Sequence, residues 1–246
     1  MHRYQILIEY VGTNFIGWQT QSKGQSIQKL IQIKISKLLK EKINLVGSGR
    51  TDSGVHAIEQ SAHFDCKKKI ENLNKFLQSI NYFLNIKLVS IINIKKKSFN
   101  FHARFSAKQR IYTYIMFNRI SSPSIEKNRG WHIKKKLDLK LMKKGAKKLL
   151  GTNDFSTFRS SSCNAKSPIR TIKSIKIKEV KNKIQIQFRS QSFLQQQVRS
   201  MVGCLKYLAE KKWDLKKFES IFKSKKRTLC APPAPAHGLF LEKVIY

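Results

Sequence analysis

The hydrophobic pattern changes its period several times along the chain, and this alternation restricts the fold more than any other feature. From Ser26 onwards, apolar residues recur at helical spacing, at positions 27, 30, 31, 35, 38 and 39. This spacing predicts an amphipathic helix with Ser26 as its N-cap. Residues 58–65 instead alternate apolar with polar side chains, as a half-buried strand does. Such a mixture of elements predicts an α+β fold with a mixed or antiparallel sheet.

The remaining elements follow the same two periods. Strands are expected at residues 5–10, 88–94, 110–117 and 239–244, and a hairpin of residues 169–180 and 184–188 is expected to turn at Lys181 and Asn182. Helices are expected around residues 73–84, 141–150, 194–208 and 218–221. A chain of 246 residues fits one large domain or two lobes. We expect an N-terminal lobe over residues 1–105 and a C-terminal lobe over residues 106–246, which share one continuous core.

The charge of the chain indicates its class of partner. Lys and Arg number 50 against 14 Asp and Glu, which gives a formal net charge of +36. So basic a surface attracts nucleic acid through counterion release, and an anionic membrane would also accept it. The excess is mostly Lys, and we assign roughly half of it to the drift of an AT-rich genome. Composition therefore indicates a polyanionic partner without specifying which.

Cysteine spacing and hydropathy exclude several classes of protein. Cys66, Cys163, Cys204 and Cys230 have neither C-x-x-C pairing nor neighbouring His at zinc-ligand spacing. We therefore expect reduced thiols and no metal site. The first ten residues follow a strand pattern without the apolar core of a signal peptide, and no apolar run approaches the length of a membrane span. These features predict a cytoplasmic protein without membrane association.

A glycine-rich loop from Gly47 to Gly54 carries Asp52, two residues after Arg50. Glycines let the backbone approach a ligand closely and hold a side chain in a fixed pose. A nearby guanidinium favours the ionised carboxylate that a nucleophile or a base requires. Asp also caps turns routinely, and on this loop alone the two interpretations are equally supported. The loop does not match a dinucleotide-binding loop, because Gly47-x-Gly49 is not followed by the third glycine of G-x-G-x-x-G. It does not match a P-loop either, because Val55 and His56 stand where a P-loop needs Lys and Ser or Thr.

Three further segments combine arginine with aromatic or apolar residues. Residues 99–105 interleave Phe with His and Arg, which suits stacking on RNA bases, although a strand with its Phe side chains in the core is the commoner explanation. Tyr112 and Tyr114 fall on one face of their strand, which tolerates polar groups or lines a cleft. Arg199 lies at the boundary of an apolar helix face. An exposed arginine is the commoner case, whereas a half-buried one would need a carboxylate such as that of Asp52.

These segments belong to an ordered series that resembles the tRNA pseudouridine synthase A family over nearly the whole chain. The series is E-Y-V-G-T at 9–13, G-W-Q at 17–19, G-R-T-D-S-G-V-H-A at 49–57, F-H-A-R-F at 101–105, R-x-Y-x-Y at 110–114, G-x-N-D-F-x-x-F at 151–158, V-R-x-M-V-G at 198–203 and A-P-x-x-G-L at 234–239. The segment at 49–57 is very specific and resembles the catalytic motif of the family. Ser53 replaces a common alanine, and residues 195–197 are all Gln where the family often has a His-containing stretch.

The resemblance implies two ferredoxin-like lobes with a mostly antiparallel sheet and a central active-site cleft. It implies an isomerase that converts uridine to pseudouridine at positions 38, 39 and 40 of the tRNA anticodon stem-loop. No cofactor is needed, and the enzyme is expected to be a homodimer whose tRNA contacts both subunits. The alternative is a catalytically inactive tRNA-binding protein or chaperone on the same fold, for which loss of the aspartate would argue.

The resemblance also implies roles for individual residues. Asp52 would be the catalytic carboxylate, and Arg199 would pair with it and keep it charged. Tyr112 would stack on the base and remove the C5 proton. Arg50 would support base flipping. The residues expected to contact tRNA are Phe101, His102, Ala103, Arg104, Phe105, Arg159, Ser162, Cys163, Asn164, Ala165 and Lys166.

Overall fold

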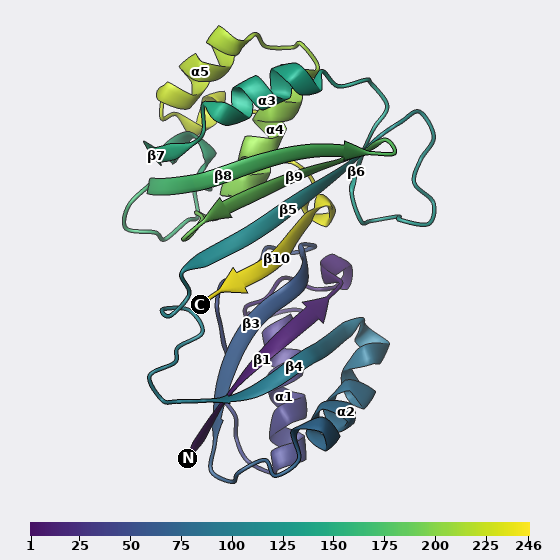
Figure 1. Cartoon of the computed structure of the whole chain (residues 1–246), viewed down its shortest axis with the longest axis vertical. Coiled ribbons are helices and arrows are strands. Elements are labelled where there is room, and N and C mark those ends of the chain that lie inside the picture. The colour runs from purple at the N-terminus through teal and green to yellow at the C-terminus, as the bar shows by residue number, and fades with distance from the viewer. The chain divides into compact units, whose positions relative to one another are not determined.

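The structure, a computed structural model, describes all residues from 1 to 246 and contains ten strands and five α-helices (Figure 1). In chain order these are β1 (His2–Tyr10), α1 (Ile27–Leu39), β2 (Val46–Gly47), β3 (His56–Cys66), α2 (Leu73–Leu84), β4 (Val89–Lys97), β5 (Gln109–Asn118), β6 (Trp131–Ile133), α3 (Leu139–Lys147), β7 (Gly151–Asp154), β8 (Ile169–Val180), β9 (Lys183–Ser190), α4 (Gln197–Ala209), α5 (Leu215–Lys223) and β10 (Leu239–Ile245). None of the helices is long and apolar enough to cross a membrane.

The chain divides into two compact units. Unit 1 comprises Met1–Lys108 together with Phe240–Tyr246, and unit 2 comprises Gln109–Leu239. The end of the chain returns to unit 1 because β10 pairs in parallel with β3, where Phe240 faces His56. The lobes expected from sequence, 1–105 and 106–246, assigned these last residues to the C-terminal lobe. Pairing between strands so far apart in the chain leaves no local signal in the sequence.

Unit 1 contains a sheet in the order β4-β1-β3-β10, with β2 paired to β3. β1 runs antiparallel to both β3 and β4. The predicted helix begins where the N-cap was expected, because the Ser26 hydroxyl accepts a hydrogen bond from the Lys29 N–H at 3.2 Å. Its apolar side is buried at Ile27, Leu30, Ile31 and Ile35, and it becomes half-buried at Leu38 and Leu39. The core of unit 1 thus forms from the periodic residues of the helix and the alternating residues of the strands.

Unit 2 contains the sheet order β5-β9-β8-β7, all antiparallel, with β6 added in parallel to β5. Figure 1 shows α3, α4 and α5 grouped on one side of this sheet. The hairpin between β8 and β9 turns at Lys181 and Asn182, whose φ values of +48° and +62° suit a two-residue hairpin loop. Gly145 of α3 lies directly against Leu208 of α4, where a Cβ would be 2.3 Å from the leucine side chain. Close helix packing therefore anchors α4.

The α+β class and the mostly antiparallel sheet are confirmed, as are the hairpin and the helix that follows Ser26. One helix starts later than expected from its apolar pattern. Residues 194–208 were expected to be helical, but α4 begins at Gln197, because Gln196 adopts a left-handed φ of +60°. β2, β6 and β7 were not predicted; each is too short to show a period.

Candidate active site

Asp52 lies on the loop that joins β2 to β3 in unit 1. The chain turns tightly just after it, since the Val55 N–H donates to the Asp52 carbonyl oxygen at 3.2 Å and Gly54 has a φ of +77°. The Asp52 side chain is half-buried, and Arg50 on the same loop is exposed. The loop is therefore a tight turn that carries a half-buried carboxylate, and the catalytic role of Asp52 stays a prediction.

The Asp52 loop is anchored on both flanks of the aspartate. The Thr51 hydroxyl forms a hydrogen bond of 2.8 Å with the Tyr10 hydroxyl, and both residues are buried. The Thr51 carbonyl oxygen accepts a hydrogen bond from the backbone N–H of Trp18 at 3.1 Å. On the other flank, the Ser53 hydroxyl donates to the Phe15 carbonyl oxygen at 3.1 Å. The segment 10–18 thus fixes the backbone on either side of Asp52.

Two glycines allow this close contact between segment 10–18 and the Asp52 loop. Gly17 has a φ of +112°, and a Cβ at this position would lie 2.6 Å from the Thr51 carbonyl oxygen. A Cβ at Gly12 would lie 2.0 Å from the Val55 carbonyl oxygen. Any side chain at either position would displace the loop. The motifs at 9–13 and 17–19 therefore support the aspartate, a role that their sequence did not reveal.

Buried polar side chains hold the two ends of the Asp52 loop. Gln60 of β3 donates from Nε2 to the Gly49 carbonyl oxygen at 2.9 Å and accepts at Oε1 from the Ser48 hydroxyl at 2.7 Å. His56 accepts the Gly12 N–H at Nδ1, at 3.0 Å, and its ring stacks on Phe240 at 4.7 Å between centroids. His56, although part of the motif, therefore acts as a structural acceptor.

Tyr112 and Tyr114 lie on the same face of β5 in unit 2, and both are buried, with exposures of 8% and 0%. The rings of Tyr112 and Phe193 pack in a T-shaped arrangement, with 5.3 Å between their centroids. The Tyr114 hydroxyl donates to the Pro235 carbonyl oxygen at 2.9 Å, and burial raises the pKa of this hydroxyl. Tyr114 therefore remains a neutral donor that positions residue 235.

Arg199 lies in the first turn of α4 and is half-buried. Its Nε donates to the Ala234 carbonyl oxygen at 2.7 Å, and its own carbonyl oxygen accepts the Ala234 N–H at 2.9 Å. Gly203, one turn further on, lies so close to the Pro232 carbonyl oxygen that a Cβ would be 2.2 Å from it. Residues 232–235 thus lie along α4 and hold the stem of Arg199. Burial, together with the charge of Arg199, lowers the pKa of His237, which keeps that imidazole neutral.

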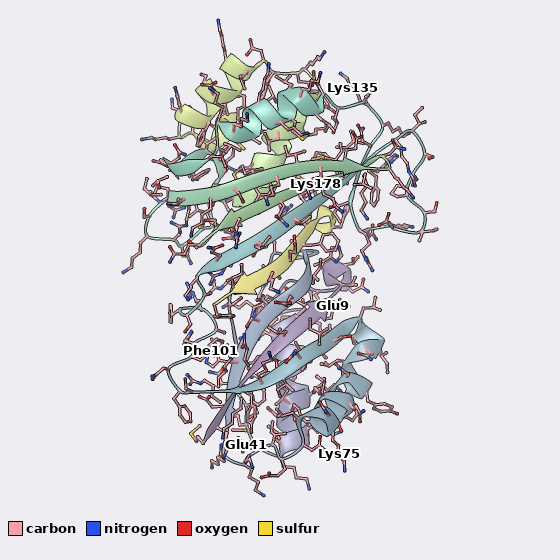
Figure 2. The ribbon with its side chains drawn as sticks, viewed as in Figure 1. Glu9, Glu41, Lys75, Phe101, Lys135 and Lys178 are labelled. Carbon is pink, nitrogen blue, oxygen red and sulfur yellow. The ribbon has the colours of Figure 1, made fainter.

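The segment after β4, which includes Phe101 (Figure 2), forms no strand, so the strand that its composition also allowed is wrong. The Ala103 N–H donates to His63 Nδ1 at 3.1 Å, and the Ala103 carbonyl oxygen accepts from the Tyr246 hydroxyl at 2.8 Å. His63 accepts because burial, with the charge of Arg3 second, lowers its pKa to about 4.

The same segment presents exposed aromatic rings beside cations. Phe105 is 76% exposed, and the Arg104 guanidinium lies 5.5 Å from its ring centroid. Phe101 is half-buried, with the Lys97 ammonium 5.1 Å from its centroid. His102 packs against Phe105, with 4.4 Å between ring centroids. Rings paired with cations in this way can stack on unpaired bases while neutralising phosphate.

Residues 160–166 form a second exposed loop, in unit 2, and Arg159 shapes it. The Arg159 guanidinium donates to the carbonyl oxygens of Cys163 and Ala165, at 2.5 Å and 2.8 Å. Cys163 is buried, which alone would raise the pKa of its thiol, but the N–H groups of Ala165 and Gln195 together with the Arg159 guanidinium lower that pKa overall. Ser162, Asn164 and Lys166 are exposed and remain accessible to a ligand.

Comparison with known proteins identifies the family of the chain. Residues 6–106 and 146–246 match the family described as tRNA pseudouridine synthase. The chain belongs to the tRNA pseudouridine synthase family. It is similar to the "tRNA pseudouridine synthase A" of Pelagibacter ubique (strain HTCC1062), with 75% identity over 246 residues and 100% of both chains covered. It is also similar to the "tRNA pseudouridine synthase A" of Maricaulis maris (strain MCS10), with 39% identity over 100% of this chain and 98% of the relative.

Membership makes this protein an isomerase that acts on uridine in tRNA. Asp52 and Arg199 lie within the two matched segments, whereas Tyr112 lies between them. Asp52 belongs to unit 1, and Tyr112 and Arg199 belong to unit 2, so the pairing of Asp52 with Arg199 stays a prediction. Tyr10 and Pro235 belong to motifs recognised in the sequence, but their supporting roles were not predicted, because these depend on contacts with distant parts of the chain.

Proposed function

We propose that this synthase converts uridine to pseudouridine at positions 38, 39 and 40 of the tRNA anticodon stem-loop, with Asp52 as its catalytic carboxylate. The observation that carries this proposal is the anchoring of the Asp52 loop, in which Thr51 and Ser53 are both bonded to segment 10–18. A side chain held at a fixed point is what attack on a single sugar carbon requires. The net charge of +36 suits a tRNA substrate.

The proposed reaction exchanges one bond of the nucleotide for another. The Asp52 carboxylate attacks the ribose C1′ or otherwise assists the loss of uracil, and the bond from C1′ to N1 breaks. The freed uracil turns and rejoins C1′ through C5, and any bond between C1′ and the Asp52 carboxylate breaks as the new bond forms. Tyr112 stacks on the base and removes the proton from C5, while N1 gains a proton. The product is an isomer of the substrate, so the reaction needs neither a redox cofactor nor a group carrier.

The other residues of the proposed site keep Asp52 charged or bind the RNA. Arg199 keeps Asp52 ionised by pairing with it. Arg50, exposed on the Asp52 loop, supports extrusion of the nucleotide from its stack. The segments 101–105 and 159–166 bind the tRNA through exposed rings and polar groups. We further propose that the enzyme is cytoplasmic and acts as a homodimer.

Tritium release tests the role of Asp52. Transcripts of tRNA labelled at C5 of uridine are incubated with the enzyme and no added cofactor, and the tritium released to water is counted. We expect release with the wild type and none above background with Asp52→Asn. The matched control is Glu59→Gln, which neutralises a half-buried carboxylate of the same unit and should leave release intact. Release by Asp52→Asn at the wild-type rate would contradict the proposed role.

The same assay tests which uridine positions of the tRNA are modified. Transcripts that keep a single uridine at 38, 39 or 40 are compared with one that has none of the three, and modified sites are mapped by carbodiimide treatment and primer extension. We expect product at each of the three positions and none in the last transcript. Binding of tRNA without any release would instead support the alternative, an inactive tRNA-binding protein.

A further inference from the structure

Cys204 and Cys230 lie side by side in unit 2, with their sulfur atoms 3.5 Å apart. Cys204 is buried in the middle of α4, and Cys230 is partly exposed directly after the 3-10 turn Arg227–Leu229. Both are free thiols. The proposed isomerisation uses neither of them, so their pairing needs a separate explanation.

The two thiols occupy unequal environments. The hydrogen bond from Cys204, with the Arg227 guanidinium adding to it, lowers the pKa of Cys230. Arg227 is held in place by its hydrogen bond of 2.8 Å to the Ser200 hydroxyl. The hydrogen bond to Cys230, followed by burial, raises the pKa of Cys204. Cys230 is the more accessible of the two sulfur atoms, so a small oxidant reaches it first, and Cys204, 3.5 Å away, is placed to resolve the oxidised sulfur.

We propose that Cys204 and Cys230 form a reversible oxidation site, which closes to a disulfide when the enzyme meets a hydroperoxide. The Cys230 thiolate attacks one peroxide oxygen, the O–O bond breaks, and a sulfenic acid and hydroxide form. The Cys204 thiol then loses its proton and attacks the Cys230 sulfur. The S–S bond forms, the S–O bond breaks, and water leaves. The two sulfur atoms lose two electrons, which the peroxide gains.

The disulfide would act on Ala234, whose carbonyl oxygen accepts the hydrogen bond from Arg199. Arg199 precedes Cys204 by five residues on α4, and Cys230 leads into the segment whose Ala234 carbonyl oxygen accepts from Arg199 Nε. A disulfide needs its sulfur atoms at about 2.05 Å, so the two must approach by about 1.5 Å from their present separation. A Cβ at Gly203 would lie 2.2 Å from the Pro232 carbonyl oxygen, so α4 and the segment that follows Cys230 are closely packed beside the two cysteines. Closure of the S–S bond is therefore expected to shift residues 230–234 against α4. This shift would lengthen the hydrogen bond from Arg199 Nε to the Ala234 carbonyl oxygen. This effect rests on the proposed role of Arg199, whereas the oxidation site does not.

The oxidation site is tested by mass and thiol count on the full chain. The reduced protein is treated with hydrogen peroxide, alkylated, and analysed by intact mass and by peptide mapping without reductant. We expect the loss of two thiols, a mass decrease of two hydrogen atoms, and a linked peptide pair that contains Cys204 and Cys230. Dithiothreitol should restore both thiols. Thiols that stay reduced, or a disulfide that joins other cysteines or two chains, would overturn the proposal.

Cysteine variants test which thiols form the disulfide and whether the disulfide changes turnover. Cys230→Ser and Cys204→Ser should form no internal disulfide, whereas Cys66→Ser, which removes a buried free cysteine of unit 1, should behave as wild type. Turnover of the oxidised wild type should fall roughly tenfold, as expected for one weakened hydrogen bond to a charged group, and recover with dithiothreitol. Cys230→Ser should not respond. A disulfide without change in turnover would refute the link to Arg199, and the mass result stands even if no isomerase activity is found.

Discussion

Gly17→Ala offers a direct test of how segment 10–18 supports the proposed catalytic aspartate. Gly17 has a φ of +112°, and an added Cβ would lie 2.6 Å from the Thr51 carbonyl oxygen and 3.2 Å from the Asp52 carbonyl carbon. The neighbours at this position are backbone atoms, which cannot rotate away as a flexible side chain could. Gly151 provides a matched control, because its φ of +85° imposes a similar backbone strain while a Cβ there would meet nothing within 4 Å.

The two effects of Gly17→Ala have different magnitudes. The left-handed backbone alone disfavours alanine by about 1–3 kcal/mol, and this cost applies to both variants. At Gly17 the Thr51 oxygen must also retreat from 2.6 Å to the 3.4 Å of an ordinary contact, a movement of about 0.8 Å. Displacement of a catalytic group by about 1 Å can reduce the rate a hundredfold. We therefore expect Gly17→Ala to lower kcat roughly ten- to hundredfold.

The measurements are urea unfolding for the free energy of unfolding and tritium release for kcat. Gly151→Ala should lose stability by the strain alone and keep the kcat of the wild type. Gly17→Ala should lose more stability and most of its kcat, with tRNA affinity nearly unchanged. If the two variants match each other in both measurements, the contact between Gly17 and the Asp52 loop has no part in catalysis.

Four further predictions concern single side chains. Arg199→Ala should lower kcat by on the order of a hundredfold and tRNA affinity much less; equal losses would identify Arg199 as an RNA contact. Tyr112→Phe should keep tRNA affinity and lose turnover in the tritium assay, and unchanged turnover would refute its role as the base. Tyr114→Phe should reduce the free energy of unfolding in urea by about 1–3 kcal/mol, because the Pro235 carbonyl oxygen loses its buried donor; no loss would mean that water replaces the hydroxyl. His63 is neutral when folded and protonates more readily when unfolded, so stability should fall as the pH drops from 6.5 towards about 4. His63→Asn, measured by urea unfolding across this range, should reduce that fall; the same pH dependence as wild type would exclude His63 as its cause.

Local patterns predicted the elements that depend on local interactions. The N-cap at Ser26 and the turn at Lys181 and Asn182 each involve residues within a few positions, so composition and spacing were sufficient. The pairing of β10 with β3 joins opposite ends of the chain, and no local pattern encodes it. The candidate site divides in the same way. The glycine spacing around Asp52 indicated a tight loop, but the need for Gly17 follows from its contact with Thr51, which only the folded chain brings about.

The anchoring of Thr51 and Ser53 affects which steps the binding energy of the tRNA can drive. Both flanks of the aspartate are bonded within the protein, so docking of the RNA need not order this loop. The interaction energy gained at the tRNA-binding residues proposed above can instead go towards pulling the target nucleotide out of its stack, which takes a few kcal/mol. Anticodon arms whose uridine is already poorly stacked should therefore react faster, with the difference appearing in the extrusion step and not in the chemistry.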